Sequence, residues 1–79
     1  MKIKSLPVGR YQAICQLEPR GKAGLEGYQA GQIYQCEFRT VGATDGRPYF
    51  RLWPNAQDDY YECCSVAQFE RFFGIKMSR

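Results

Sequence analysis

Short runs of alternating apolar and polar residues, separated by segments with glycine or proline, govern how this 79-residue chain can fold. Successive side chains of a β-strand point to opposite faces, so each run predicts a strand with one face toward a core. Four such strands and a short fifth are predicted, over residues 10–17, 33–41, 48–53, 60–64 and 75–77. A chain of this length supports one domain around one small core.

The hairpin between the second and third strands has two candidate registers. A tight two-residue turn at Asp45-Gly46, a strong hairpin signal, would mix the apolar and polar faces unless a bulge intervened. A wider loop sets Phe38 opposite Phe50. It also sets Glu37 opposite Arg51. Because the wider loop brings apolar side chains together and opposes unlike charges, we predict that register.

A short helix is predicted near the C-terminus. Ser65, followed three residues later by Gln68, forms a capping-box pattern that starts a helix. Gly74 suits the left-handed residue that follows a helix. The helix should therefore span residues 66–73.

The order of these elements favours a mainly β fold. Residues 18–28 hold three glycines and one proline, which predicts a long irregular loop with Leu25 as its apolar anchor. Four to five short antiparallel strands, one long early loop and one short C-terminal helix are typical of a small SH3-like barrel. An OB-type barrel is the alternative. Residues 1–79 would form this single domain, with residues 1–8 as a candidate flexible N-terminal arm.

Composition argues against an enzyme. The chain has no histidine, which excludes Ser-His-Asp and Cys-His catalysis and imidazole metal sites. No cofactor is expected, because the glycines of the loop over residues 18–28 match no phosphate-binding motif. No run approaches the ~20 apolar residues of a membrane span, and residues 1–7 lack the apolar core of a signal peptide. We therefore expect a soluble cytoplasmic protein with no membrane partner.

Four cysteines, Cys15, Cys36, Cys63 and Cys64, show no CxxC spacing. Neighbours in a strand point to opposite faces, so Cys63 and Cys64 are poorly placed to ligate one metal ion. In a reducing cytoplasm we expect buried or half-buried free thiols, with a disulfide pair or a four-thiolate zinc site as the alternatives. The acidic residues Asp58, Asp59 and Glu62 lack the pattern of a calcium loop and predict a solvated turn with no metal.

One face of the predicted sheet combines rings with guanidinium groups. If Phe38, Phe50 and Leu52 point inward, the alternating residues Arg39, Tyr49, Arg51 and Trp53 point outward on neighbouring strands. Protein interfaces are enriched in these residue types, and single-stranded nucleic acid stacks its bases on such rings. The plain structural alternative is that Trp53 closes one end of the fold and Arg51 only pairs with Glu37.

Several of these residues also carry a resemblance to a known group of proteins. A strand with Ile14-Cys15, a loop ending at Leu25, and Gly31-Gln32-Ile33-Tyr34 at the next strand are similar to small phage and prophage proteins. The likeness continues through Tyr60-Tyr61 to Phe69-Glu70 and covers about residues 10–74. It implies an SH3-like barrel and a bacterial mobile-element context, and it transfers no active site.

Two functions from different classes follow. The favoured one is a non-catalytic module that docks on a host or phage protein, as anti-defence and host-takeover inhibitors do. The alternative is a nucleic-acid-binding module, supported by a net charge of +3 from 11 basic and 8 acidic residues. The candidate binding residues are Arg39, Arg47, Tyr49, Arg51 and Trp53, with Arg20 and Lys22 on the long loop. A third possibility is a homodimer through an open sheet edge.

Overall fold

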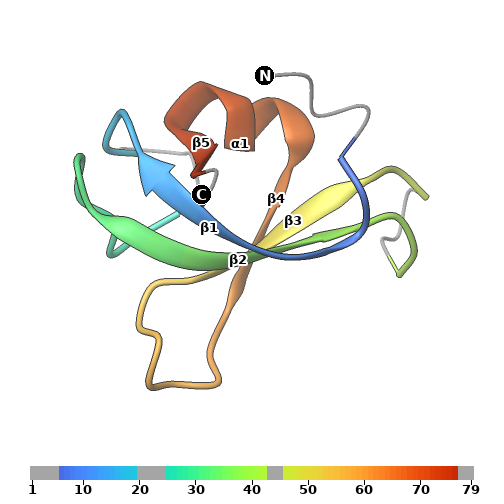
Figure 1. Cartoon of the computed structure of the whole chain (residues 1–79), viewed down its shortest axis with the longest axis horizontal. Coiled ribbons are helices and arrows are strands. Elements are labelled where there is room, and N and C mark those ends of the chain that lie inside the picture. Colours follow the sequence, from blue (N-terminus) through green and yellow to red (C-terminus); the bar gives the residue numbers. More distant parts are fainter. Residues whose placement is uncertain (1–5, 20–24, 43–45, 77–79) are drawn as a thin grey trace.

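The computed structural model describes residues 6–19, 25–42 and 46–76. Within these residues, five strands and one helix follow in the order β1 (Gly9–Cys15), β2 (Ile33–Arg39), β3 (Tyr49–Trp53), β4 (Glu62–Ser65), α1 (Val66–Phe72) and β5 (Phe73–Lys76). The strands pair antiparallel in one open sheet of order β4-β3-β2-β1-β5. Figure 1 shows α1 lying on one side of the curved sheet, while the β3–β4 loop projects away from it. The mainly β class with one short helix is therefore confirmed.

The predicted register of the central hairpin is confirmed. Phe38 lies opposite Phe50 in the β2–β3 pair. Glu37 lies opposite Arg51 in the same pair. A one-residue slip would send every side chain of a strand to the other face, so this register fixes which residues enter the core.

The first four strands are shorter than the alternating pattern predicted, whereas β5 begins two residues before its predicted start. β1 ends at Cys15, and the next two backbone amides, of Gln16 and Leu17, both donate to the carbonyl of Phe72. Leu17, the last residue of the predicted strand over residues 10–17, is 54% exposed because the chain has already left the strand. At the other end of the sheet, Tyr60 precedes β4 because its amide donates to the Asp58 carboxylate, which holds it in a turn.

The helix begins as predicted and ends differently. Ser65 and Gln68 form both hydrogen bonds of a capping box. The prediction that Gly74 adopts a left-handed conformation is wrong: Phe73 has φ −131° and ψ 164° and leads directly into β5. Gly74 instead permits close approach, because a Cβ there would lie 2.9 Å from Nε2 of Gln16.

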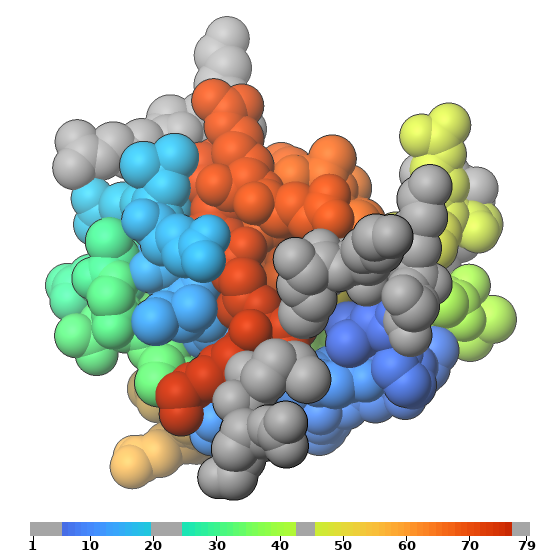
Figure 2. All heavy atoms as spheres, turned by 45° about the horizontal axis from the view of Figure 1, so that its top comes forward, coloured from blue at the N-terminus to red at the C-terminus, as the bar shows by residue number. Residues whose placement is uncertain are grey.

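The core fills the space between the inner face of the sheet and α1. Phe50 on β3 stacks on Phe69 of the helix, with ring centroids 3.8 Å apart and planes at 10°. Phe69 in turn stacks on Phe73 at 5.5 Å, which ties the helix to β5. In Figure 2 the orange-to-red chain of α1 and β5 lies beside the blue residues of β1, its partner in the sheet. The core is thus continuous from β4 to β5.

The long loop after β1 is anchored in this core by more than the predicted residue. Leu25 is 3% exposed, as predicted. Tyr28, which the sequence analysis did not single out, is equally buried and packs edge-on against Tyr34 and Phe73. Its hydroxyl donates to the carbonyl of Leu52 at 3.4 Å. Burial, with the nearby Glu62 carboxylate, raises the pKa of Tyr28.

Three of the four free thiols belong to the core. Cys15, Cys36 and Cys64 are buried, whereas Cys63 is exposed. The expected opposite orientation of Cys63 and Cys64 is therefore confirmed. Burial raises the pKa of Cys15, and raises those of Cys36 and Cys64 to about 12. These buried sulfurs are protonated at neutral pH and behave as small apolar side chains.

We predict that Phe69→Leu lowers the free energy of unfolding by about 1–3 kcal/mol, because it removes the ring that stacks on Phe50. Urea denaturation measures the loss. Val41→Ala serves as the control, because Val41 is 68% exposed and should change stability by no more than about 0.5 kcal/mol. Equal effects of the two substitutions would contradict this account of the core.

We also predict that stability falls as pH rises above about 9. The unfolded Cys36 thiol has an ordinary pKa of 9.0, whereas the folded one has a pKa of about 12. Between these values only the unfolded state loses its proton, so each such thiol lowers the free energy of unfolding by up to about 1.4 kcal/mol per pH unit. Urea midpoints measured at pH 8, 9 and 10 should fall less steeply in Cys36→Ala. Val41→Ala, which removes an exposed side chain and no thiol, should leave the slope unchanged.

Candidate functional site

The side of the sheet away from α1 gathers most of the predicted binding residues. We call it the outer face; its side chains come from β1 (Arg10, Gln12), β2 (Gln35, Glu37, Arg39), β3 (Tyr49, Arg51, Trp53) and β4 (Cys63). They alternate with core residues along each strand, so the same registers that build the core also set their positions. Tyr61, just before β4, packs against Trp53 at the margin of this face.

A single carboxylate lies at the centre of the outer face. Glu37 is opposite Arg10 in the β1–β2 pair and opposite Arg51 in the β2–β3 pair. Its Oε2 lies 3.3 Å from Nη1 of Arg39, and its Oε1 lies 3.7 Å from Nη1 of Arg51. Nε of Arg39 also donates to the Tyr49 hydroxyl at 3.1 Å, a contact that raises the pKa of the guanidinium. Glu37 thus partly neutralises the basic cluster around it.

Two rings lie between two guanidinium groups along one margin of the outer face. Arg10 lies over the Trp53 ring, 4.8 Å from its centroid. Trp53 packs against Tyr61 with centroids 5.6 Å apart. Arg51 lies over the Tyr61 ring at 4.6 Å. We call these four residues the arginine–aromatic stack. Its members hold one another in place, which reduces the side-chain entropy that a binding partner would have to restrict.

The structure separates the predicted binding residues into three groups. Arg39, Tyr49, Arg51 and Trp53 come together on the outer face. Arg47 is exposed in the segment before β3 and lines a hollow beside β4. The predicted loop residues, Arg20 and Lys22, lie outside the described part of the chain.

Two residues of the stack were missed by the sequence analysis. Arg10 is the first residue of the predicted strand over residues 10–17 and has the same parity as Gln12, so alternation along that strand could have placed it on the outer face. Tyr61 has the same parity as Cys63 but was considered only as part of a fourth strand. Their contacts with Trp53 and Arg51 depend on side-chain reach across neighbouring strands, which alternation does not specify.

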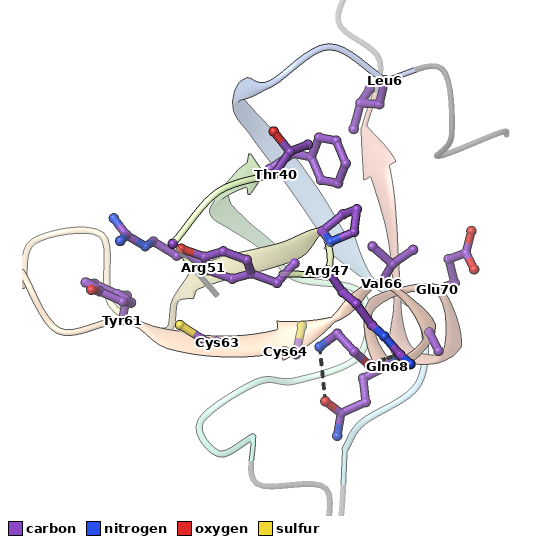
Figure 3. Close-up of a pocket in the computed structure, with 16 residues that line it drawn as sticks. Leu6, Thr40, Arg47, Arg51, Tyr61, Cys63, Cys64, Val66, Gln68 and Glu70 are labelled. Atoms are coloured by element: carbon purple, nitrogen blue, oxygen red, sulfur yellow. Dashed lines mark hydrogen bonds between the residues drawn. The ribbon is translucent and has the colours of Figure 1, made fainter. Parts of the chain in front are cut away.

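A hollow of about 1070 Å³ runs along β4. Figure 3 shows Arg51, Tyr61 and Cys63 at one end of it, and Val66, Gln68 and Glu70 of α1 at the other. Its walls therefore include part of the outer face and continue past the edge of the sheet onto the helix.

The acidic residues near β4 have structural partners. Glu62 accepts hydrogen bonds from the Glu26 amide at 3.3 Å and from the Tyr60 hydroxyl at 3.2 Å, which fastens the long loop to the edge of the sheet. The hydrogen bond to Glu62 raises the pKa of Tyr60. Among residues 6–19, 25–42 and 46–76, no three Cys, Asp or Glu side chains converge as ligands for a metal ion. The outer face therefore offers stacking surfaces and N–H donors as its chemistry.

Comparison with protein-family models, with curated proteins and with solved structures finds no match for this chain. Within the described residues, the seven-residue α1 is the only helix, and it is too short to cross a bilayer. The site is therefore interpreted from its own geometry.

We predict that Glu37→Gln lowers the free energy of unfolding by a few tenths to about 1 kcal/mol, because it leaves Arg39 and Arg51 without their shared carboxylate. Added salt should recover most of this loss by screening the repulsion among the arginines. Glu70→Gln, on the exposed side of α1, makes the same change in net charge and is the control. A loss that is the same in both variants, or that salt does not reduce, would contradict the role of Glu37.

Proposed function

We propose that this protein is a non-catalytic binding module that docks on another protein through the outer face of its sheet. The observation that carries the proposal is the arginine–aromatic stack of Arg10, Trp53, Tyr61 and Arg51. Trp, Tyr and Arg contribute most to binding energy at protein interfaces, because they make large directional contacts. A stack held in place before binding lowers the entropic cost of the complex.

The position of Glu37 favours a protein partner over nucleic acid. Glu37 occupies donors of both Arg39 and Arg51, and it places a negative charge at the centre of the face. A phosphate backbone crossing this face would meet that charge, whereas a protein surface can place a polar donor against it. Protein partners also tolerate mixed charge, with complementarity set residue by residue.

The finer fold assignment and the biological context belong to the same proposal. An SH3-like barrel is supported by the strand order β4-β3-β2-β1-β5, by the long loop between β1 and β2, and by the helix between β4 and β5. The resemblance to small phage and prophage proteins supports a mobile-element origin. The partner would then be a host or phage protein that the module inhibits by steric docking.

Nucleic-acid binding is the second candidate. It is favoured by Arg10, whose guanidinium stacks on Trp53 and, among the described residues, makes no ion pair with a carboxylate. Lys76 extends the basic surface, because it lies opposite Gln12 in the β1–β5 pair. Rings with nearby cations are the usual platform for single-stranded nucleic acid.

Affinity capture from bacterial lysate tests the proposal. The wild-type chain and the control Val41→Ala should recover the same stoichiometric protein partner, and Trp53→Ser should reduce its recovery. With the purified partner, Arg10→Ala and Trp53→Ser should each weaken binding by about tenfold or more, the effect of a hot-spot residue. No stoichiometric partner, or equal affinity for Trp53→Ser and wild type, would contradict docking through the outer face.

A short single-stranded oligonucleotide tests the second candidate in parallel. If that candidate is correct, its affinity should fall about tenfold or more between 50 and 200 mM salt. Glu37→Gln should raise the affinity, because it removes the negative charge beside the arginines. Absence of binding at low salt would exclude this candidate.

A further inference from the structure

The open edge of β4 presents unpaired backbone groups. The amide of Ser65 donates to Oε1 of Gln68 in the capping box, so it points away from β3. Residues two apart in a strand direct their backbone groups to the same side. The N–H and C=O of Cys63 therefore also point away from β3, toward the open edge.

Hydrogen bonds at the far side of the sheet give the same assignment. The Cys15 amide donates to the carbonyl of Gln32 at 2.9 Å, so Cys15 and its alternate neighbours in β1 face β2. The same alternation can be followed from β1 through the registers of β2 and β3. It makes Cys64 and Phe50 a hydrogen-bonded pair between β3 and β4. Cys63 lies between hydrogen-bonded positions, so its backbone N–H and C=O face the open edge.

The edge of β4 lacks some of the features that protect sheet edges, although the strand is only four residues long. The β4 sequence, Glu-Cys-Cys-Ser, contains no lysine and no proline. The hollow runs along this strand and is lined by Tyr61, Cys63 and Ser65, so no described residue fills the space beside the edge. An unpaired edge of this kind is a template for one more strand.

We propose that an extended segment of the partner protein adds to the edge of β4 as a further strand, with acidic side chains at the positions that lie on the outer face. This inference rests on the proposed function and names the chemistry of the partner. Backbone hydrogen bonds to Cys63 supply the pairing, and the acidic side chains supply the selectivity.

Arg51 is the residue that selects an acidic side chain. It lies opposite Cys63 in the β3–β4 pair, and both residues line the hollow along β4. Among the described residues, Nε of Arg51 is the buried side-chain nitrogen without a hydrogen-bond partner. Nε itself is buried, but the Arg51 side chain is 26% exposed, so its terminal nitrogens have donor capacity beyond the 3.7 Å contact with Glu37. A carboxylate from an added strand matches this guanidinium in charge, and it would lie beyond β4, on the other side of Arg51 from Glu37.

A second copy of this chain does not provide that match. In an antiparallel pair of two β4 strands centred on Cys63, the thiols would face each other on the outer face. Glu62 has the opposite parity and is already bonded to the Glu26 amide and the Tyr60 hydroxyl. No carboxylate of the partner copy's β4 would then reach Arg51, so we commit to an acidic segment of another protein.

A displayed library of random peptides of about twelve residues, long enough for one strand, tests the inference. Selection on the wild-type chain should enrich peptides in which acidic and β-branched residues alternate. Binding of an enriched peptide is then measured by the fluorescence of Trp53, the single tryptophan. The same peptide with glutamine in place of each acidic residue should bind about tenfold more weakly.

Two matched variants separate backbone pairing from charge. Cys63→Pro removes the outward donor without removing a hydrogen bond to β3, and should weaken peptide binding by about tenfold or more. Cys63→Ser keeps the donor and should bind like wild type. Arg51→Gln should weaken binding of the acidic peptide and leave binding of the glutamine peptide unchanged. This comparison tests the charge contact even if Cys63→Pro fails to fold.

The inference is overturned by any of four results. These are no enrichment, enriched peptides without alternating acidic residues, equal peptide binding by folded Cys63→Pro and by wild type, and a dimer in light scattering that Cys63→Pro abolishes. If the edge tests fail while Trp53→Ser still weakens binding of the captured partner, only the further inference is contradicted. If Cys63→Pro weakens peptide binding but Trp53→Ser leaves binding of the captured partner unchanged, the proposed function is contradicted.

Discussion

The stack of Phe50 on Phe69 is the contact on which the rest of the structure depends. A seven-residue helix is too short to be stable by itself in water, so α1 exists because its inward rings are buried against the sheet. Phe69 then contacts Phe73, and Phe73 begins the strand that pairs with β1. One aromatic column therefore joins β3, the helix and the last strand. The long loop adds Tyr28 to the same column through Phe73.

The core and the outer face are two sides of the same strands. Phe50 enters the core and its neighbour Arg51 points outward, because side chains alternate in a strand. A rigid core therefore gives the outer residues fixed positions, and their own contacts refine them: Glu37 holds Arg39 and Arg51, and the rings orient the guanidinium groups. Such a surface is suited to recognition, since binding need not first order it. The unpaired β4 edge adds a second mode of contact beside this face.

Local patterns were enough to predict the strands, the register and the start of the helix. Matching apolar partners and opposite charges specified the pairing of Phe38 with Phe50, and the Ser65–Gln68 spacing specified the cap. Strand ends were predicted less well: Leu17 continues the apolar pattern of β1 after the chain has left the sheet, and β2 ends at Arg39, two residues before its predicted end. The end of the helix was also missed, since pairing of Phe73 with Cys15 overrides the local preference of Gly74. Of the candidate site, alternation placed Arg39, Tyr49, Arg51 and Trp53 on one face, but it could not show that Arg10 and Tyr61 contact Trp53 and Arg51.

The amino-acid sequence by itself determined the class of fold, the inward and outward sets of residues, and the absence of histidine chemistry. These properties follow from composition and from the period of a strand, which are local. Only the tertiary structure decided that Arg10 reaches Trp53, that Glu62 holds the long loop, and that Cys63 faces an open edge. Those features join residues far apart in the chain. They depend on how strands lie beside one another and how far side chains extend across them, and no local pattern encodes either.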